Sequence, residues 1–311
     1  MNEIAKQYDL VIIGAGPAGL TASIYASRYG INHLVIGNKI GGEVFGWHEI
    51  GNFPSYDLIK GVDLAEKMKT QVEKLGATIL NDTVENIEKD PSMQLRTGFK
   101  IQTLSNGTIE AKTVLLALGT REKKLGIEGE DQFVGKGVSY CVHCDGAFFK
   151  DKKVAVVGGG DSAITAALYL TDIAKQVYVI NRSDKLKAEK IWQRKLKEKN
   201  NVEFLLETNI VKMTGVNVLN KIILNNGNEI EIDGVFIEIG SMPDLSSVDK
   251  MNLETDKKGC IKISKDGATN VEGIWAAGDT TDGSNNFRQV ITACAEGAIT
   301  AKSIHSNLSV R

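Results

Sequence analysis

The decapeptide Leu10-Val11-Ile12-Ile13-Gly14-Ala15-Gly16-Pro17-Ala18-Gly19 predicts a buried β-strand, a glycine-rich turn and the start of a helix. In a Gly-x-Gly-x-x-Gly turn the first glycine permits the bend, the second lets the backbone approach a pyrophosphate, and the third lets helix and strand pack closely. The N-terminus of the helix then presents free N–H groups to the phosphates. This stretch therefore predicts a dinucleotide site.

The same pattern occurs a second time in the chain. Residues 8–37 align with residues 152–181 at a constant offset of 144, and the turn recurs as Gly158-Gly159-Gly160-Asp161-Ser162-Ala163. Each copy has an apolar strand, a glycine turn, an alanine-rich helix and a second apolar strand, which together are a βαβ unit. Glycines that serve only a tight turn do not explain why the whole pattern is repeated. We therefore predict two dinucleotide sites.

Three apolar strands that end in glycine lie farther along the chain, at residues 113–119, 234–240 and 273–278. The first two close the two βαβ units, and the third belongs to the first domain, which resumes after an insertion. We therefore predict an α/β fold of two Rossmann-like (three-layer ββα) dinucleotide-binding domains. The expected boundaries are 1–116 with 245–311 for the first domain and 117–244 for the inserted domain. Asn-Gly pairs predict hairpins, with strands at 99–103 and 108–110 and at 221–224 and 229–232.

The overall composition excludes several classes of partner. Lys and Arg total 37 against 39 Asp and Glu, a net charge of −2, so nothing favours nucleic acid or an anionic membrane. Residues 1–20 lack the basic stretch, the long apolar core and the cleavage site of a signal peptide. The longest apolar runs fall well below the roughly 20 residues of a membrane helix. We expect a cytoplasmic protein that binds neither nucleic acid nor a membrane.

A pair of cysteines precedes the second glycine turn, in Cys141-Val142-His143-Cys144-Asp145. The chain has four cysteines, too few for a secreted disulfide framework, and a lone Cys-x-x-Cys in a reducing compartment is catalytic or metal-binding. At the start of a helix such a pair can lower the pKa of one sulfur and keep both sulfurs close enough to form a disulfide. Two dinucleotide sites beside one dithiol predict electron transfer from a nicotinamide through a flavin to a disulfide.

The residues of this pentapeptide have alternative interpretations. Asp145 either carries a proton to or from the leaving thiolate, provided that burial raises its pKa, or caps the N-terminus of a helix. Cys141, His143 and Cys144 are also residue types that bind zinc. A structural zinc site needs four ligands, and no second pair with matching spacing exists, so no metal is predicted. His143 receives no fixed role.

The end of the second strand in each βαβ unit indicates which nucleotide the unit binds. An acidic residue there hydrogen-bonds a ribose 2′-hydroxyl, whereas a basic residue binds a 2′-phosphate. In the second unit Arg182 and Lys187 follow this strand and favour NADPH over NADH, or else they form a solvated surface. In the first unit no acid follows the strand, so Asn38 or the turn Gly41-Gly42-Glu43 must bind the ribose.

With these motifs in place, the chain resembles the low-molecular-weight thioredoxin reductases of bacteria and archaea over essentially its full length. These enzymes are class II of the FAD/NAD(P)-dependent pyridine nucleotide-disulfide oxidoreductases. The resemblance is carried by residues 14–19, 139–146, 158–163 and 278–279 with 288–290. It implies that Cys141 and Cys144 are the redox pair and that Asp145 is the acid-base residue.

The resemblance also implies a cofactor site in each domain. Segments 41–43 and 49–54 are similar to the flavin-facing loops of the family. The residues implied to bind FAD are Gly14, Gly16, Pro17, Ala18, Gly19, Asn38, Gly41, Gly42, Glu43, Asn52, Gly119, Gly278, Asp279, Arg288, Gln289 and Val290. The residues implied to bind NADPH are Gly158, Gly160, Asp161, Ser162, Ala163, Arg182, Ser183 and Lys187.

The implied activity is electron transfer from NADPH, through FAD and the Cys141–Cys144 disulfide, to oxidised thioredoxin or a thioredoxin-like protein. The family implies a homodimer. The redox pair lies in the nicotinamide domain but must meet first a flavin and then a protein, so we expect a domain rotation about residues 119–120 and 240–243. We expect no redox domain before residues 1–8, in contrast to the fused hydroperoxide-reductase relatives.

The sequence departs from the family in places that leave alternatives open. The family's NADPH-binding arginine cluster is reduced to Arg182, with Ser183 and Lys187 at the other two positions, so a weaker NADPH preference or an atypical electron donor is an alternative. Glu43 stands where glutamine is more usual, and His143 where a small hydroxyl residue is common. The further alternatives are a flavoprotein with another disulfide acceptor, and a flavin-binding redox sensor whose cysteines hold a metal.

Overall fold

Strand β1 (Gln7–Ile13) lies at the centre of the largest sheet, because its residues Leu10, Val11 and Ile12 are completely buried. The computed structural model describes residues 7–47, 49–90 and 98–309. Residues 1–6, at the start of the segment in which we expect no signal peptide, lie outside the described residues. The chain divides into two compact units, Met1–Arg121 with Met242–Arg311 and Glu122–Ser241. Each unit is described by itself.

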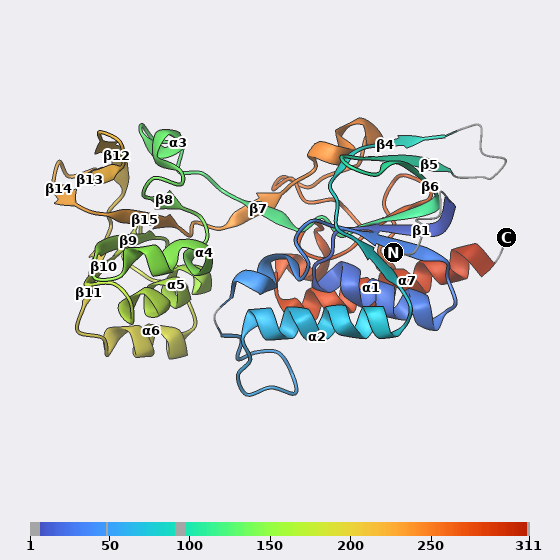
Figure 1. Cartoon of the computed structure of the whole chain (residues 1–311), viewed down its shortest axis with the longest axis horizontal. Coiled ribbons are helices and arrows are strands. Elements are labelled where there is room, and N and C mark those ends of the chain that lie inside the picture. Colours follow the sequence, from blue (N-terminus) through green and yellow to red (C-terminus); the bar gives the residue numbers. More distant parts are fainter. Residues whose placement is uncertain (1–6, 48, 91–97, 310–311) are drawn as a thin grey trace. The chain divides into compact units, whose positions relative to one another are not determined.

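The first unit is built on a seven-stranded sheet in the order β3-β2-β1-β6-β5-β4, with β17 paired to β6. Alternate residues of β1 belong to two different hydrophobic clusters, Leu10 and Ile12 to one and Val11 and Ile13 to the other, so the sheet is buried on both faces. Helices α1, α2 and α7 pack on one of these faces (Figure 1). The strands are β2 (His33–Ile36), β3 (Thr78–Leu80), β4 (Val84–Lys89), β5 (Phe99–Thr103), β6 (Gly107–Leu116) and β17 (Ile274–Ala276). The helices are α1 (Pro17–Arg28), α2 (Gly61–Lys74) and α7 (Val290–Ser309), with 3-10 helices η1 (Gly42–Gly46), η3 (Ser246–Met251) and η4 (Gly283–Asn286).

Strand β6 corrects the sequence prediction at one point. Residues 108–110 and 113–119 were expected as two separate strands, one of a hairpin and one that closes the βαβ unit. They form a single strand that ends at Leu116. Its first half pairs antiparallel with β5, and its second half pairs parallel with β1. No turn-forming residue separates the two halves, so the strand continues without a break while its partner changes.

The second unit repeats the first βαβ pattern on a five-stranded parallel sheet in the order β11-β10-β9-β15-β8. Val156 lies opposite Val179, as Ile12 lies opposite Val35 in the first unit, so the predicted duplication is confirmed in the strand register. Helices α5 and α6 cover one face, and a three-stranded antiparallel sheet, β12-β13-β14, covers the other. The two layers of strands and one of helices confirm the predicted fold class.

The elements of the second unit are as follows. The strands are β8 (Val138–Ser139), β9 (Lys153–Val157), β10 (Gln176–Asn181), β11 (Val202–Leu206), β12 (Ile210–Gly215), β13 (Leu219–Leu224), β14 (Glu229–Glu231) and β15 (Gly234–Ile237). The helices are α3 (Glu130–Phe133), α4 (Val142–Asp145), α5 (Asp161–Thr171) and α6 (Lys190–Lys197), with the 3-10 helix η2 (Gly146–Phe149). The predicted hairpin at Asn226-Gly227 is confirmed as β13 and β14.

The chain passes between the units at two short strands, β7 (Thr120–Glu122) and β16 (Ser241–Pro243), which form a two-stranded sheet. Strand β17 pairs parallel with β6 in the sheet of the first unit. Among the described residues, no helix has the length and apolar character needed to cross a bilayer.

Candidate active site

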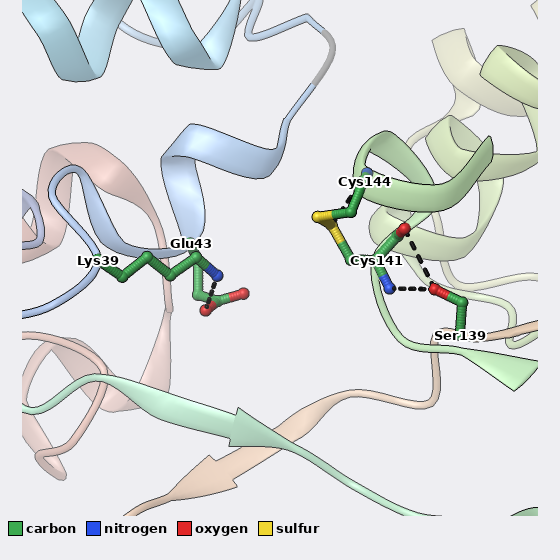
Figure 2. Close-up of a disulfide and its surroundings, with 5 residues drawn as sticks. All are labelled: Lys39, Glu43, Ser139, Cys141 and Cys144. Atoms are coloured by element: carbon green, nitrogen blue, oxygen red, sulfur yellow. Dashed lines mark hydrogen bonds and ion pairs between the residues drawn. A yellow bond between two sulfur atoms is a disulfide. The ribbon is translucent and has the colours of Figure 1, made fainter. Parts of the chain in front are cut away.

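Cys141 and Cys144 form a disulfide at the start of helix α4, with their Cα atoms 5.3 Å apart (Figure 2). Cys141 is the N-cap residue, and the backbone N–H of Cys144 donates to its Sγ at 3.2 Å. The side chain of Cys144 is exposed and that of Cys141 is half-buried. The two cysteines of the Cys-x-x-Cys motif are therefore paired with each other. In the described part of the chain, no group of three or more His, Cys, Asp and Glu side chains is placed to hold a metal ion.

Ser139 holds the backbone of Cys141 in place. Its Oγ accepts from the N–H of Cys141 at 3.0 Å and donates to the carbonyl oxygen of Cys141 at 3.2 Å (Figure 2). Ser139 itself is buried at the end of β8. Sequence reasoning quoted Ser139 in the motif but gave it no role.

Asp145 and His143 lie next to the disulfide in helix α4. Asp145 is the last residue of α4 and is half-buried, and its side chain caps no helix. Cys141 takes the N-cap position of α4, and Asp145 takes that of the 3-10 helix η2 without a side-chain cap hydrogen bond. The ring of His143 packs edge-on against Tyr169 of α5, with 4.7 Å between the ring centroids.

The second glycine turn has the geometry of a phosphate-binding loop. Gly158 has φ +146°, and a Cβ there would lie 2.2 Å from the carbonyl oxygen of Glu238, so only glycine fits. Gly160 differs, since a Cβ there would meet no atom within 4 Å. This space lies directly at the N-terminus of α5, where backbone N–H groups are free for phosphate oxygens.

The loop after β10 lies against this turn. The N–H groups of Lys187 and Ala188 donate to the carbonyl oxygen of Gly159 at 2.7 and 3.0 Å. Buried Asn181 donates to the carbonyl oxygens of Ser183 and Lys185, at 2.9 and 3.2 Å, and thereby closes the loop on itself. The structure therefore brings Arg182, Ser183 and Lys187 beside the second turn, although they lie 19 to 24 residues beyond its last residue in sequence.

The remaining predicted residues of this site start helix α5. One carboxylate oxygen of Asp161 accepts from the N–H of Glu189 at 2.7 Å, which ties the start of α6 to the start of α5. Ser162 is exposed and Ala163 is buried. Arg182 and Lys187 are exposed, and within the described part of the chain neither forms an ion pair.

The first glycine turn has the same geometry. Gly14 has φ +112°, and a Cβ there would lie 2.0 Å from the carbonyl oxygen of Ala117. A Cβ on Gly16 would come no closer than 3.8 Å to any atom, so space is again left at the helix N-terminus. Pro17, Ala18 and Gly19 form the first turn of α1. The loop 41–43 lies over this turn, because the N–H of Gly41 donates to the carbonyl oxygen of Ala15 at 2.8 Å.

A chain of hydrogen bonds lies at the end of β2, where the sequence has no acidic residue to bind a ribose. Asn38 follows β2, and its amide donates to the hydroxyl of Thr83 at 2.9 Å. Buried Asp82 in turn accepts from the N–H of Thr83 and from the side chain of Asn106, both at 2.7 Å. Sequence reasoning missed Asp82 and Thr83. The available signal was three polar residues, Asn81, Asp82 and Thr83, just after the strand at 78–80.

The segment after β17 is shaped by Glu296 of α7, which sequence reasoning also missed. Its carboxylate accepts from the N–H of Gly278 at 2.8 Å and from the hydroxyls of Thr281 and Ser284 at 2.8 and 2.7 Å. A small pocket lined by Asp279, Arg288 and Glu296, among others, lies here.

The other predicted flavin-site residues are distributed around the first unit. Asn52 donates to the side chain of Gln289 at 2.8 Å, which joins two segments 237 residues apart. The Arg288 guanidinium contacts buried Cys260 at 3.4 Å. Val290 is the buried first residue of α7, and Gly119 precedes β7. Glu43 pairs with Lys39 at 2.9 Å on the surface (Figure 2), a contact of little energetic weight.

Asp279 gives a pH-dependent prediction. Burial raises its pKa from 3.8 to about 6, a rise that Arg288 opposes and that Glu296 and Glu43 increase. The folded state therefore keeps the proton to a higher pH than the unfolded state, so the free energy of unfolding falls as pH rises from about 4 to about 6. In flavin-free protein, Asp279→Asn should remove this fall and raise that free energy by about 1 to 3 kcal/mol at pH 7.5.

Urea unfolding of both proteins at pH 4, 6 and 7.5 measures this difference. The two unfolding free energies should agree near pH 4, where the aspartic acid is protonated in both states. A constant difference between the proteins across this range would contradict the assigned titration.

Comparisons with known proteins agree over nearly the whole chain. The family described as pyridine nucleotide-disulphide oxidoreductase matches residues 8–297. The thioredoxin reductase of Bacillus subtilis is 36% identical over 306 residues, which are 96% of this chain and 94% of that protein. The solved thioredoxin reductase of Lactococcus lactis has a TM-score of 0.91 and 33% identity, over 98% of this chain and 100% of its own. The solved thioredoxin reductase of T. acidophilum has a TM-score of 0.90 and 32% identity, over 99% of this chain and 100% of its own.

FAD and NADPH are the cofactors of these enzymes, and the two glycine turns fit them. Both turns leave space at a helix N-terminus where a Cβ would project, and basic residues lie beside the second turn. The chain belongs to the pyridine nucleotide-disulphide oxidoreductase family, and within it to the low-molecular-weight thioredoxin reductases.

Proposed function

We propose that this chain transfers electrons from NADPH, through FAD and the Cys141–Cys144 disulfide, to oxidised thioredoxin or a thioredoxin-like protein. The disulfide at an exposed helix start, in the same unit as the second nucleotide turn, is the observation that carries this proposal. Each residue role that follows is part of the proposal. The bound FAD would supply a centre that accepts a hydride and passes two electrons to a disulfide.

The redox pair and Asp145 divide the remaining chemistry between them. Two electrons and two protons convert the Cys141–Cys144 disulfide to two thiols. One thiolate then attacks the disulfide of the partner protein, which forms a mixed disulfide and releases one thiolate of the partner. The second thiolate of the pair attacks the mixed disulfide, which re-forms the internal disulfide and releases the reduced partner. Asp145, one residue after Cys144, would hold the proton that the departing thiolate needs.

The nucleotide roles follow from the two turns. The N–H groups at the starts of α1 and α5 would bind the pyrophosphates of FAD and NADPH. The Asn38–Thr83 pair and the loop 41–43 would orient the FAD ribose, and the segment from Gly278 to Val290 would contact the flavin. Arg182, Ser183 and Lys187 would bind the NADPH 2′-phosphate.

We further propose a homodimer in the cytoplasm, with a rotation of the two units about β7 and β16 between the two half-reactions. The net charge of −2 supports a partner other than nucleic acid or a membrane.

An anaerobic titration tests the proposal. The yellow protein should lose its flavin absorbance with one equivalent of NADPH per redox centre, and it should then reduce purified thioredoxin much faster than small disulfides. A colourless protein that takes up no FAD, or a flavin that NADPH does not reduce, would refute the proposed function. Equal rates with small disulfides would favour another acceptor.

The preference for NADPH has a separate test in the loop after β10. Arg182→Gln and Lys187→Gln should each lower the ratio of kcat/KM for NADPH over NADH roughly tenfold, because a charge-assisted contact with a phosphate is worth about 1.5 kcal/mol. Lys185→Gln is the control, since Lys185 is exposed in the same loop and lies outside the predicted site. An unchanged ratio in both variants would assign these cations to a solvated surface and favour an atypical electron donor.

A further inference from the structure

Glu130 is a buried carboxylate close in sequence to the redox pair, and neither the motifs nor the proposed chemistry use it. The residue is 2% exposed and opens the short helix α3. Its two carboxylate oxygens accept from the N–H groups of Leu125 and Gly126, at 2.9 and 2.6 Å, and from the hydroxyl of Tyr140 at 2.6 Å. Burial of a carboxylate costs free energy unless donors replace the lost water, and hydrogen bonds to a charged acceptor are stronger than neutral ones.

Tyr140 connects this carboxylate to the disulfide. It directly precedes Cys141, whose backbone is held by Ser139 on the other side of Tyr140. The ring of Tyr140 packs in the hydrophobic cluster that also contains Phe133 and Met213. Burial and the neighbouring Glu130 raise the pKa of the Tyr140 hydroxyl, so it stays protonated and donates to the carboxylate.

The other partners of Glu130 lie where the chain enters the second unit. Leu125 and Gly126 follow β7 by only a few residues. The same loop is fixed farther on, because the N–H of Met213 in β12 donates to the carbonyl oxygen of Glu128 at 2.9 Å. Glu130 therefore joins three segments of the second unit: the entry loop, helix α3 and the residue before Cys141.

We propose that Glu130 is a positioning residue for the redox pair. Glu130 acts through the hydroxyl of Tyr140 and holds the backbone that leads into Cys141. This inference rests on the proposed function and adds a determinant of its redox balance. A rigid backbone before Cys141 keeps the two thiols at a high effective concentration, and this favours the closed disulfide. Loosening that backbone should favour the reduced dithiol.

The test compares two variants of the full-length holoenzyme with two controls. Tyr140→Phe removes only the hydroxyl, and Glu130→Gln keeps the shape but replaces one acceptor by a donor that faces backbone N–H groups. Tyr178→Phe removes a hydroxyl from the same hydrophobic cluster, and Glu128→Gln removes an exposed carboxylate two residues from Glu130. The measurement is the equilibrium between dithiol and disulfide in glutathione buffers, read by thiol alkylation and mass spectrometry of the peptide with Cys141 and Cys144.

We expect the equilibrium constant for disulfide closure to fall about tenfold in Tyr140→Phe and Glu130→Gln, a shift of about 30 mV toward a more oxidising potential. The two controls should stay within twofold of the unsubstituted protein. Folded variants with an unchanged constant, or controls that shift as much, would overturn the proposal and leave Glu130 a stabilising residue only. Should Glu130→Gln not fold, Tyr140→Phe decides alone. Glutathione equilibrium needs neither NADPH nor thioredoxin, so this outcome is independent of the flavin titration that tests the proposed function.

Discussion

Cys141→Ser and Cys144→Ser should each reduce turnover with a protein disulfide by on the order of 10³-fold or more, because a single sulfur cannot both attack the partner and release it. Reduction of the flavin by NADPH should remain, because these substitutions leave both glycine turns unchanged and the proposed hydride transfer to FAD precedes the step at the two sulfurs. Stopped-flow absorbance measures flavin reduction, and thioredoxin turnover measures the complete cycle. The two readouts should therefore separate.

The control for this experiment is Cys294→Ser. Cys294 is a free, half-buried cysteine on α7, and burial raises the pKa of its thiol. Its substitution should leave thioredoxin turnover within about twofold, as for most changes that affect no reacting group. Retained thioredoxin reduction in either variant of the redox pair would overturn the dithiol assignment.

Gly160→Ala should raise the KM for NADPH by on the order of 100-fold, because its methyl group would occupy the space proposed for the pyrophosphate. The structure predicts that the fold itself tolerates this change. Gly160 has φ −89° and ψ −175°, which alanine adopts readily, and its Cβ would meet no protein atom within 4 Å. The loss of chain entropy in the unfolded state should even stabilise the protein by about 0.4 to 1 kcal/mol.

The contrast with Gly158→Ala makes this prediction specific. Alanine at Gly158 meets the Glu238 carbonyl oxygen at 2.2 Å and an unfavourable φ of +146°, so that variant should lose stability as well as NADPH binding. Steady-state kinetics, flavin content and thermal unfolding distinguish the two variants. A normal KM for NADPH in folded Gly160→Ala would place the pyrophosphate elsewhere.

Most of the fold could be predicted from the sequence, because each helix and strand is set by residues that are close together in the chain. The strand and helix patterns after residues 10 and 154, and the turns between them, depend on neighbours within a few residues of each other. The Cys-x-x-Cys pair is equally local, and its spacing of three residues allows the disulfide that the structure shows. The prediction was wrong for β6, where a strand that changes partner midway has the pattern of two strands.

The amino-acid sequence alone thus determined two βαβ units, their glycine turns and a cysteine pair. Each of these is recognised from the spacing of apolar residues, glycines or cysteines that are close together in sequence. Only the tertiary structure decided which single polar side chains bond to these segments. Glu296 meets Gly278 across 18 residues, Asn38 meets Thr83 across 45, and Tyr140 meets Glu130 across 10. Each of these is one hydrogen-bonding side chain with no periodic neighbours, and burial in the folded chain is what brings it to its partner.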